Sequence, residues 1–185
     1  MKEMLDEKLF RHSMGVAKAA ASLAEYYGQS KEKAYLTGIV HDYGKRYSRQ
    51  ELIKKAEEMN LRLDRVTREE SRLLHAPVGA ALLKSEGKVK DPEILRAVYY
   101  HTTGRKGMTG LEKVIYLADY IEEGRDFAEA DKIRKLAWSD PEQAMLEAVE
   151  FAIESVLQRG LLLHPRSVAF RNSLLVTQRK AKNNR

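Results

Sequence analysis

The chain has 185 residues and no cysteine, and its 33 basic and 27 acidic residues leave a formal net charge of +6. This length fits one domain with a substantial core, and the missing thiols exclude disulfides, cysteine-ligated zinc and a thiolate nucleophile. No apolar run approaches the roughly 20 residues of a membrane span, and the charged N-terminus is unlike a secretory signal, so we expect a soluble, cytoplasmic protein.

Helix signals recur along the whole chain and no segment shows the two-residue alternation of a strand, which predicts an all-α fold. The expected helices cover 5–27, 30–44, a segment opened by Ser48, another opened by Thr67, 76–86, 92–101, 111–123, 141–159 and 165–171. Capping-box pairs predict three of the starts, at Ser48 with Glu51, Thr67 with Glu70 and Thr109 with Glu112. Asp-Pro pairs predict two others, and Pro77 predicts a start just after His75.

No repeat or linker divides these elements, so we expect a single domain over 1–178, a compact bundle of about eight helices. The last seven residues, 179–185, are mostly basic and contain no large apolar side chain that could anchor them. We expect this segment to be a frayed, solvated tail rather than an arm that binds nucleic acid.

The pair His41-Asp42 lies in an otherwise apolar segment of the expected second helix. A carboxylate in such surroundings is costly unless it is paired, hydrogen-bonded or bound to a metal. Neighbouring helical residues point about 100° apart, so both side chains reach one ion only if other helices complete its ligand shell. Taken alone, the dipeptide fits a local His–carboxylate hydrogen bond equally well.

A larger set changes this interpretation, because metal-binding residue types, apart from the adjacent pair, each lie on or at the end of a separate expected helix. The set consists of His12, His41, Asp42, His75, His101 and Asp119. A core histidine would explain His12 alone and a salt bridge would explain Asp119 alone, but the set holds four of the chain's five histidines. Nitrogen and oxygen ligands without thiolates suit a first-row ion such as iron or manganese, which predicts hydrolysis by a metal-activated water.

The surrounding sequence contains RHS at 11–13, GIVHDYGK at 38–45, LHAPVGA at 74–80, HTTG at 101–104, YLADYIE at 116–122 with Arg125, and His164-Pro165 with Arg171-Asn172. With these blocks, the chain resembles the HD phosphohydrolase superfamily, and within it the YqeK-type symmetrical bis(5′-nucleosyl)-tetraphosphatases, over nearly its full length. The resemblance implies an HD-domain helical bundle that cleaves diadenosine tetraphosphate into two molecules of ADP.

The resemblance also implies roles for individual residues. The metal, iron or else manganese or cobalt, would be held by His12, His41, Asp42 and Asp119. His75 and His101 would either bind a second metal or bind phosphate, and this choice stays open. Lys45 and Arg125 would hold the polyphosphate, and Asp42 would accept the proton of the attacking water. The nucleoside pocket would be lined by Leu163, His164, Pro165, Arg166 and Ser167.

Two alternatives remain at this point. An HD-type nucleotidase would release phosphate from (deoxy)nucleoside monophosphates, and its products would distinguish it. A basic, helical nucleic-acid-binding protein would explain the net charge but not the set of histidines and aspartates. We therefore expect a nucleotide as the partner, with neither membrane nor nucleic acid, and the prediction allows a homodimer.

Overall fold

The structure is a computed structural model that describes residues 7–183. Over this range it is all helical and contains no strand, which confirms the predicted fold class. The elements are α1 (Glu7–Tyr26), α2 (Lys31–Val40), the 3-10 helix η2 (Tyr43–Arg46), α3 (Arg49–Glu58), α4 (Arg65–Glu69), α5 (Ser71–Ser85), α6 (Pro92–Tyr100), α7 (Gly110–Ile121), α8 (Ala130–Ala137), α9 (Pro141–Gln158) and α10 (Pro165–Asn183).

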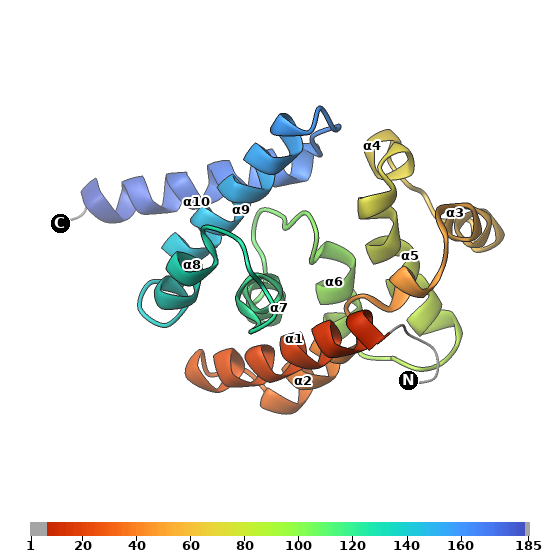
Figure 1. Cartoon of the computed structure of the whole chain (residues 1–185), viewed down its shortest axis with the longest axis horizontal. Coiled ribbons are helices and arrows are strands. Elements are labelled where there is room, and N and C mark those ends of the chain that lie inside the picture. The colour runs from red at the N-terminus through yellow and green to blue at the C-terminus, as the bar shows by residue number, and fades with distance from the viewer. Residues whose placement is uncertain (1–6, 184–185) are drawn as a thin grey trace.

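Helix α7 is the centre of the packing, with α1, α2, α6, α8 and α9 around it (Figure 1). Its central turns are apolar on nearly every side, as a fully surrounded helix requires, and Val114, Ile115 and Leu117 are completely buried. Helices α1 and α2 lie side by side beneath it, and α3 to α5 form a second lobe on the right of Figure 1. Asp119 on α7 is thereby held at the middle of the molecule.

Two glycines allow the backbone of η2 to approach α5 very closely. A Cβ atom on Gly44 would clash with the backbone of His75, and one on Gly79 would lie 2.8 Å from the backbone nitrogen of Gly44. Any side chain at either position would therefore force the two segments apart. This contact fixes the turn that carries Asp42 against the helix that carries His75.

Several helix starts follow their predicted caps. Ser48 with Glu51 and Thr109 with Glu112 both form complete capping boxes, and Asp91 and Asp140 cap α6 and α9. The Thr67–Glu70 capping box was a wrong prediction: Thr67 lies inside α4, where its backbone N–H donates to the actual cap, Asp64. Helix α8 was not predicted from the sequence. Ten α-helices lie within 7–183, where about eight were expected.

The end of the second helix and the start of α5 differ from the prediction. The second helix ends at Val40 rather than near Gly44, because the chain turns at Asp42 into η2. Helix α5 begins at Ser71, so His75 lies inside it and Pro77 is accommodated within the helix. The first helix is described from Glu7, and the expected residue Leu5 lies outside the described part.

The basic segment near the C-terminus is helical as far as it is described. Helix α10 continues to Asn183 instead of ending at Arg171, so 179–183 form its last turns, while 184–185 lie outside the described residues. Phe170 and Leu174 bury the first half of α10 against the domain, and the basic residues at its end suit the negative end of the helix dipole. No helix within 7–183 is long and apolar enough to cross a membrane.

Candidate metal centre and active site

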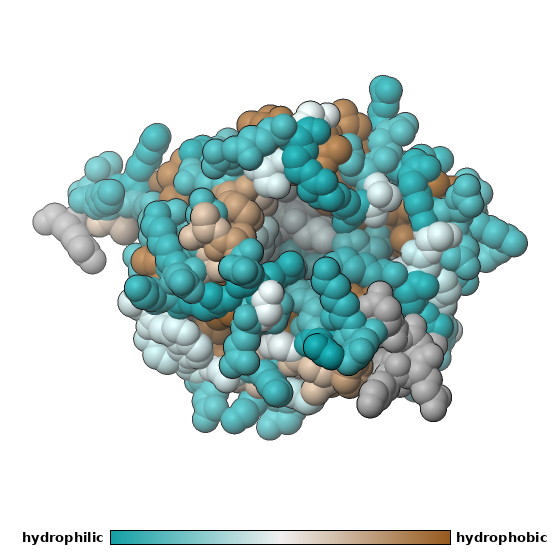
Figure 2. Space-filling view, in the orientation of Figure 1, coloured by the Kyte–Doolittle hydropathy of each residue, from teal (hydrophilic) through white to brown (hydrophobic). Residues whose placement is uncertain are grey.

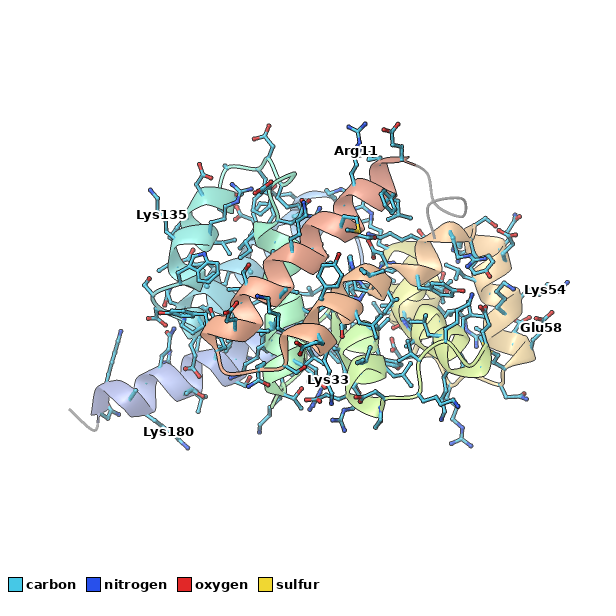
Figure 3. All side chains as sticks on the ribbon, turned by 90° about the horizontal axis from the view of Figure 1, so that it is seen from below. Arg11, Lys33, Lys54, Glu58, Lys135 and Lys180 are labelled. Carbon is cyan, nitrogen blue, oxygen red and sulfur yellow. The ribbon has the colours of Figure 1, made fainter. Side chains whose placement is uncertain are left out.

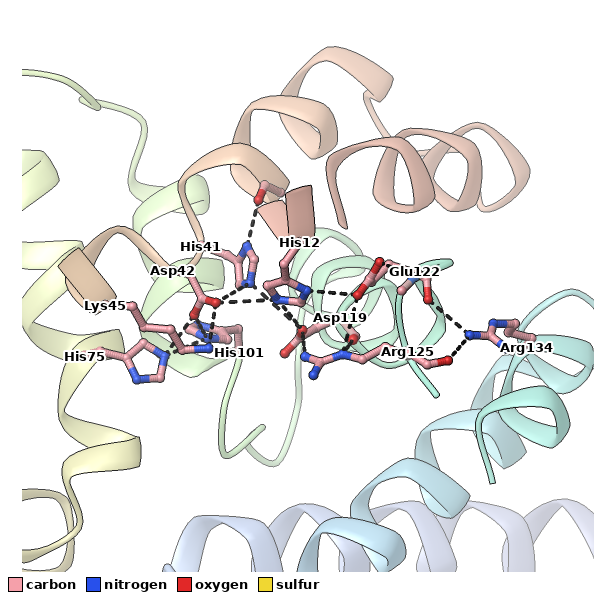
Figure 4. A network of polar contacts seen from close by, with 12 residues as sticks. His12, His41, Asp42, Lys45, His75, His101, Asp119, Glu122, Arg125 and Arg134 are labelled. Carbon is pink, nitrogen blue, oxygen red and sulfur yellow. Dashed lines mark hydrogen bonds and ion pairs between the residues drawn. The ribbon is translucent and has the colours of Figure 1, made fainter. Parts of the chain in front are cut away.

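The six residues singled out in the sequence converge at the centre of the molecule (Figure 4). They come from α1 (His12), the turn after α2 (His41 and Asp42), α5 (His75), the C-terminal end of α6 (His101) and α7 (Asp119). Figure 2 shows a hollow, ringed mainly by hydrophilic residues, over the region between α5 and α7 in Figure 1. The predicted constellation is thus a spatial cluster.

Backbone carbonyls fix the orientation of two imidazole rings. His41 Nδ1 lies 2.7 Å from the carbonyl oxygen of Gly38, and His101 Nδ1 lies 2.7 Å from that of Val98. Because a carbonyl oxygen only accepts hydrogen bonds, each Nδ1 must carry the proton and donate it. In the neutral ring the opposite nitrogen, Nε2, then offers a lone pair to the centre of the cluster.

The carboxylate of Glu122 fixes the orientation of the His12 ring in the same way, because His12 Nδ1 lies 3.0 Å from Glu122 Oε1. Its Nε2 faces two other carboxylates, 3.1 Å from Asp119 Oδ1 and 3.5 Å from Asp42 Oδ2, and His41 Nε2 lies 3.2 Å from Asp42 Oδ2. Both Nε2 atoms are buried and have no hydrogen-bond partner among residues 7–183. Lone pairs and carboxylate oxygens that face one another at these distances repel unless a proton or a metal cation lies among them, so the residues fit a metal ion.

Asp42 joins this group to a second one. Its other oxygen, Oδ1, lies 3.1 Å from His75 Nε2 and 3.3 Å from His101 Nε2, and these two nitrogens are 3.1 Å apart. His12 and His41 thus face one carboxylate oxygen of Asp42, and His75 and His101 face the other. The second group can hold an ion or donate to phosphate, and the geometry is compatible with both roles.

The charges of the cluster favour a bound cation. Burial lowers the pKa of His12, but the nearby carboxylates of Asp119 and Asp42 outweigh burial and raise this pKa to about 9. Burial also works against ionisation of Asp42, yet the neighbouring histidines hold its pKa well below the usual value. Burial lowers the pKa of His75 to about 4 despite the opposing effect of Asp42, so this imidazole is neutral at pH 7. The carboxylates that favour a proton on His12 favour a metal cation in its place.

The two cations expected at the polyphosphate lie beside the cluster. Lys45 Nζ is 2.7 Å from Asp42 Oδ2, and Arg125 forms a close ion pair with the carboxylate of Asp119. Arg125 Nε also donates to the backbone carbonyl of Asp119 at 2.7 Å. Both cations line a cleft of about 1300 Å³ that reaches His12, so they are accessible to a bound anion.

The family model of the HD domain matches residues 9–135, more than half of the chain. This chain is a member of the HD domain family. All six residues of the cluster lie inside the matched range, whereas 163–167 lie beyond it.

Two curated relatives of this HD domain protein are each described as "Bis(5'-nucleosyl)-tetraphosphatase, symmetrical". The one from Bacillus subtilis is 40% identical over 167 residues, which cover 89% of this chain and 88% of the relative. The one from Halalkalibacterium halodurans is 36% identical over 179 residues, which cover 97% and 95%. A crystal structure from Clostridium acetobutylicum, described as a predicted HD superfamily hydrolase involved in NAD metabolism, has a TM-score of 0.90 and 37% identity, covering 95% of this chain and 93% of that one.

Two residues of this HD domain that support the cluster, Glu122 and Arg134, were not predicted from the sequence. Glu122 Oε2 accepts a hydrogen bond from the backbone nitrogen of Gly124 at 2.7 Å, and a Cβ on Gly15 would collide with the same oxygen. Arg134 donates to the carbonyl oxygens of Ile121 and Glu122, at 3.0 and 3.2 Å. Glu122 is thereby fixed in the position from which it orients the imidazole ring of His12. The sequence signal for Glu122 was an acidic residue three positions after Asp119. No sequence pattern near Arg134 indicates its role.

The expected nucleoside segment 163–167 lies beside the turn that follows His101. Ser167 Oγ donates to the carbonyl oxygen of Thr103 at 3.2 Å, and His164 Nε2 lies 3.1 Å from Asp64 Oδ2. The guanidinium of Arg166 lies over two tyrosine rings of α6. A cavity of about 80 Å³ is lined partly by Leu163, His164 and Ser167. Within 7–183, the hydrogen bonds of this segment go to these neighbours and not to the six clustered residues.

Proposed function

We propose that this HD domain protein hydrolyses diadenosine tetraphosphate symmetrically, to two molecules of ADP, at a divalent metal bound in the central cluster. The observation that carries the proposal is the convergence of buried imidazole lone pairs and carboxylate oxygens, beside two accessible cations. Relatives named for the symmetrical reaction match most of the chain at 34–40% identity, which supports this substrate.

The ligands of the ion would be His12, His41, Asp42 and Asp119. When bound, a divalent ion lowers the pKa of a coordinated water and polarises a phosphoryl oxygen. Glu122 keeps the proton of His12 on Nδ1, so that Nε2 faces the ion. Asp42 remains a carboxylate and accepts the proton of the attacking water, and its pKa, well below the usual value, keeps it ionised at neutral pH.

The remaining residues act on the polyphosphate. Lys45 and Arg125 offset the negative charge on the phosphoryl oxygens as the bridge between the second and third phosphorus breaks. His75 and His101 either donate hydrogen bonds to phosphate or hold a second ion. Leu163, His164, Pro165, Arg166 and Ser167 contact one nucleoside.

We further propose iron as the ion, with manganese and cobalt as the alternatives, because every donor in the cluster is nitrogen or oxygen. Metal analysis of the purified protein tests this assignment. A homodimer and a cytoplasmic location stay predictions from the sequence.

The substrate is tested with a panel of dinucleoside polyphosphates and nucleoside monophosphates. We expect ADP from diadenosine tetraphosphate and no release of inorganic phosphate from the monophosphates. Phosphate released from the monophosphates, with the dinucleotide left intact, would identify a nucleotidase instead.

Arg125→Ala should lower kcat/KM roughly tenfold to a hundredfold, because a charge-assisted hydrogen bond to phosphate is worth about 1.5–3 kcal/mol. Metal content should stay the same, since His12, His41, Asp42 and Asp119 all remain. Arg125→Lys should recover part of the loss, because it keeps the charge but not the planar fork. Steady-state kinetics and metal analysis of both variants check this, and parental kinetics for Arg125→Ala at low salt would remove Arg125 from the site.

A further inference from the structure

A symmetrical dinucleotide substrate needs a binding site for each of its two nucleosides, and the proposed function, on which this inference rests, assigns only one. The cleaved bridge lies at the middle of the molecule, so an adenosine extends from the metal centre on each side. Segment 163–167 accounts for one of them. This segment forms hydrogen bonds with the turn after α6 and with Asp64. The α1 side of the metal centre is therefore left for the second adenosine.

The cleft that holds Lys45 and Arg125 continues away from the centre along α1. Its floor on this helix is formed by His12, Gly15, Ala19 and Ser22, which share one face because they are three or four residues apart. The small side chains at the last three positions leave space above this face of the helix. From His12 to Ser22 the helix rises about 15 Å, which is comparable to an extended nucleoside diphosphate. Figure 3 shows α1 crossing the molecule from Arg11 toward the side on which Lys135 marks α8.

An exposed aromatic side chain, Trp138, lines the far end of this cleft. Its side chain is 42% exposed, yet its backbone is firmly held: Tyr26 Oη donates to the carbonyl oxygen of Trp138 at 2.6 Å, and Tyr27 donates to that of Ala137. The Tyr26 ring also packs edge-on against the indole, with the ring centroids 5.5 Å apart. A large aromatic surface that is rigid and open to solvent suits the stacking of a nucleobase.

A cation lies between the metal centre and this aromatic surface. Lys18 is exposed and lines the same cleft, and its side chain has no ion pair or hydrogen bond with another residue of the described range. It is six residues beyond His12 on α1, about 9 Å along the axis, where the phosphate nearest the second ribose would pass. Lys18 thus has the charge and the position needed to form an ion pair with that phosphate.

We propose that the cleft along α1 binds the second nucleotide half of the substrate, with its adenine stacked on Trp138 and its ribose-linked phosphate held by Lys18. The two halves of the substrate then lie on different sides of the metal centre. The occupant of this site is a nucleoside diphosphate moiety, recognised by one aromatic ring and one cation.

Tryptophan fluorescence gives a direct test, because Trp138 is the chain's one tryptophan. The metal-loaded protein is titrated with a diadenosine tetraphosphate in which a methylene group replaces the oxygen between the second and third phosphorus, so that it cannot be cleaved there. We expect saturable quenching by this analogue and none by inorganic tetraphosphate, which carries no base. Analogue that binds in equilibrium dialysis without changing the emission would overturn the proposal.

Kinetics of variants give an independent test. Trp138→Ala should raise KM for diadenosine tetraphosphate about tenfold, as the loss of one base–aromatic stack predicts, and leave the inhibition constant of inorganic tetraphosphate unchanged. Trp138→Phe should stay close to the parent, and so should Tyr35→Ala, a matched change of an exposed aromatic residue on α2. Lys18→Ala should raise KM most strongly at low salt.

The outcomes separate this inference from the function on which it rests. An unchanged KM in Trp138→Ala, or equal losses for the dinucleotide and for inorganic tetraphosphate, would overturn the second half-site while cleavage to ADP stands. Quenching by the analogue in a protein that does not cleave diadenosine tetraphosphate would refute the proposed function and leave the binding site supported.

Discussion

Asp42→Ala is expected to lower turnover by at least about a thousandfold and to lower the metal content of the purified protein. The reason is the place of this carboxylate between the two groups of histidines. One oxygen faces His12 and His41, and the other lies within 3.3 Å of both His75 and His101. Its removal takes a ligand from an ion beside His12 and His41 and from a second ion beside His75 and His101, and also removes the acceptor for the proton of water.

The matched control for this change is Asp42→Asn, which keeps the shape of the side chain and removes the charge. It should be almost as inactive as Asp42→Ala, while both variants retain a cooperative thermal unfolding transition. Enzyme kinetics, metal analysis and calorimetry on the same preparations check the prediction. Normal metal occupancy with substantial activity in either variant would refute the assignment of Asp42 as a ligand.

His75→Ala and His101→Ala should each lower kcat on the order of a hundredfold, with only a small change in melting temperature. Both rings face Asp42 Oδ1, and His75 is neutral at pH 7 because burial lowers its pKa to about 4. A melting temperature that falls in parallel with the rate would instead make them core histidines.

Metal stoichiometry in these two variants decides between the roles that remain open. If the histidines hold a second ion, His75→Ala loses that ion and retains the one at His12, His41 and Asp119. If they donate to phosphate, the stoichiometry is that of the parent and only the kinetic constants change. The measurement is elemental analysis per mole of folded chain.

Several helix starts were predictable because a side chain caps its own helix, although at α4 the true cap, Asp64, was passed over for Thr67. Ser48 and Thr109 act within four residues of sequence, so their motifs carry the information. The end of α2 was not predictable, because the apolar run through Val40 shows no local stop. The chain turns there since Gly44 must fit against the backbone of His75, a contact between distant segments.

The same distinction applies to the site. The six clustered residues were identified because their types and their placement on separate helices required a common centre. The supporting role of Arg134 depends on the packing of α8 beside the end of α7, and no local sequence pattern predicts this packing.

The central claim is that a metal held by His12, His41, Asp42 and Asp119 drives symmetrical hydrolysis of a dinucleoside tetraphosphate. Its most direct test is chromatography of the nucleotides formed from diadenosine tetraphosphate, by the metal-loaded protein and by the same preparation after chelation. The account predicts ADP as the single nucleotide product, at two per substrate, and its disappearance after chelation. Equal amounts of AMP and ATP, or ADP formation that survives complete removal of metal, would contradict it.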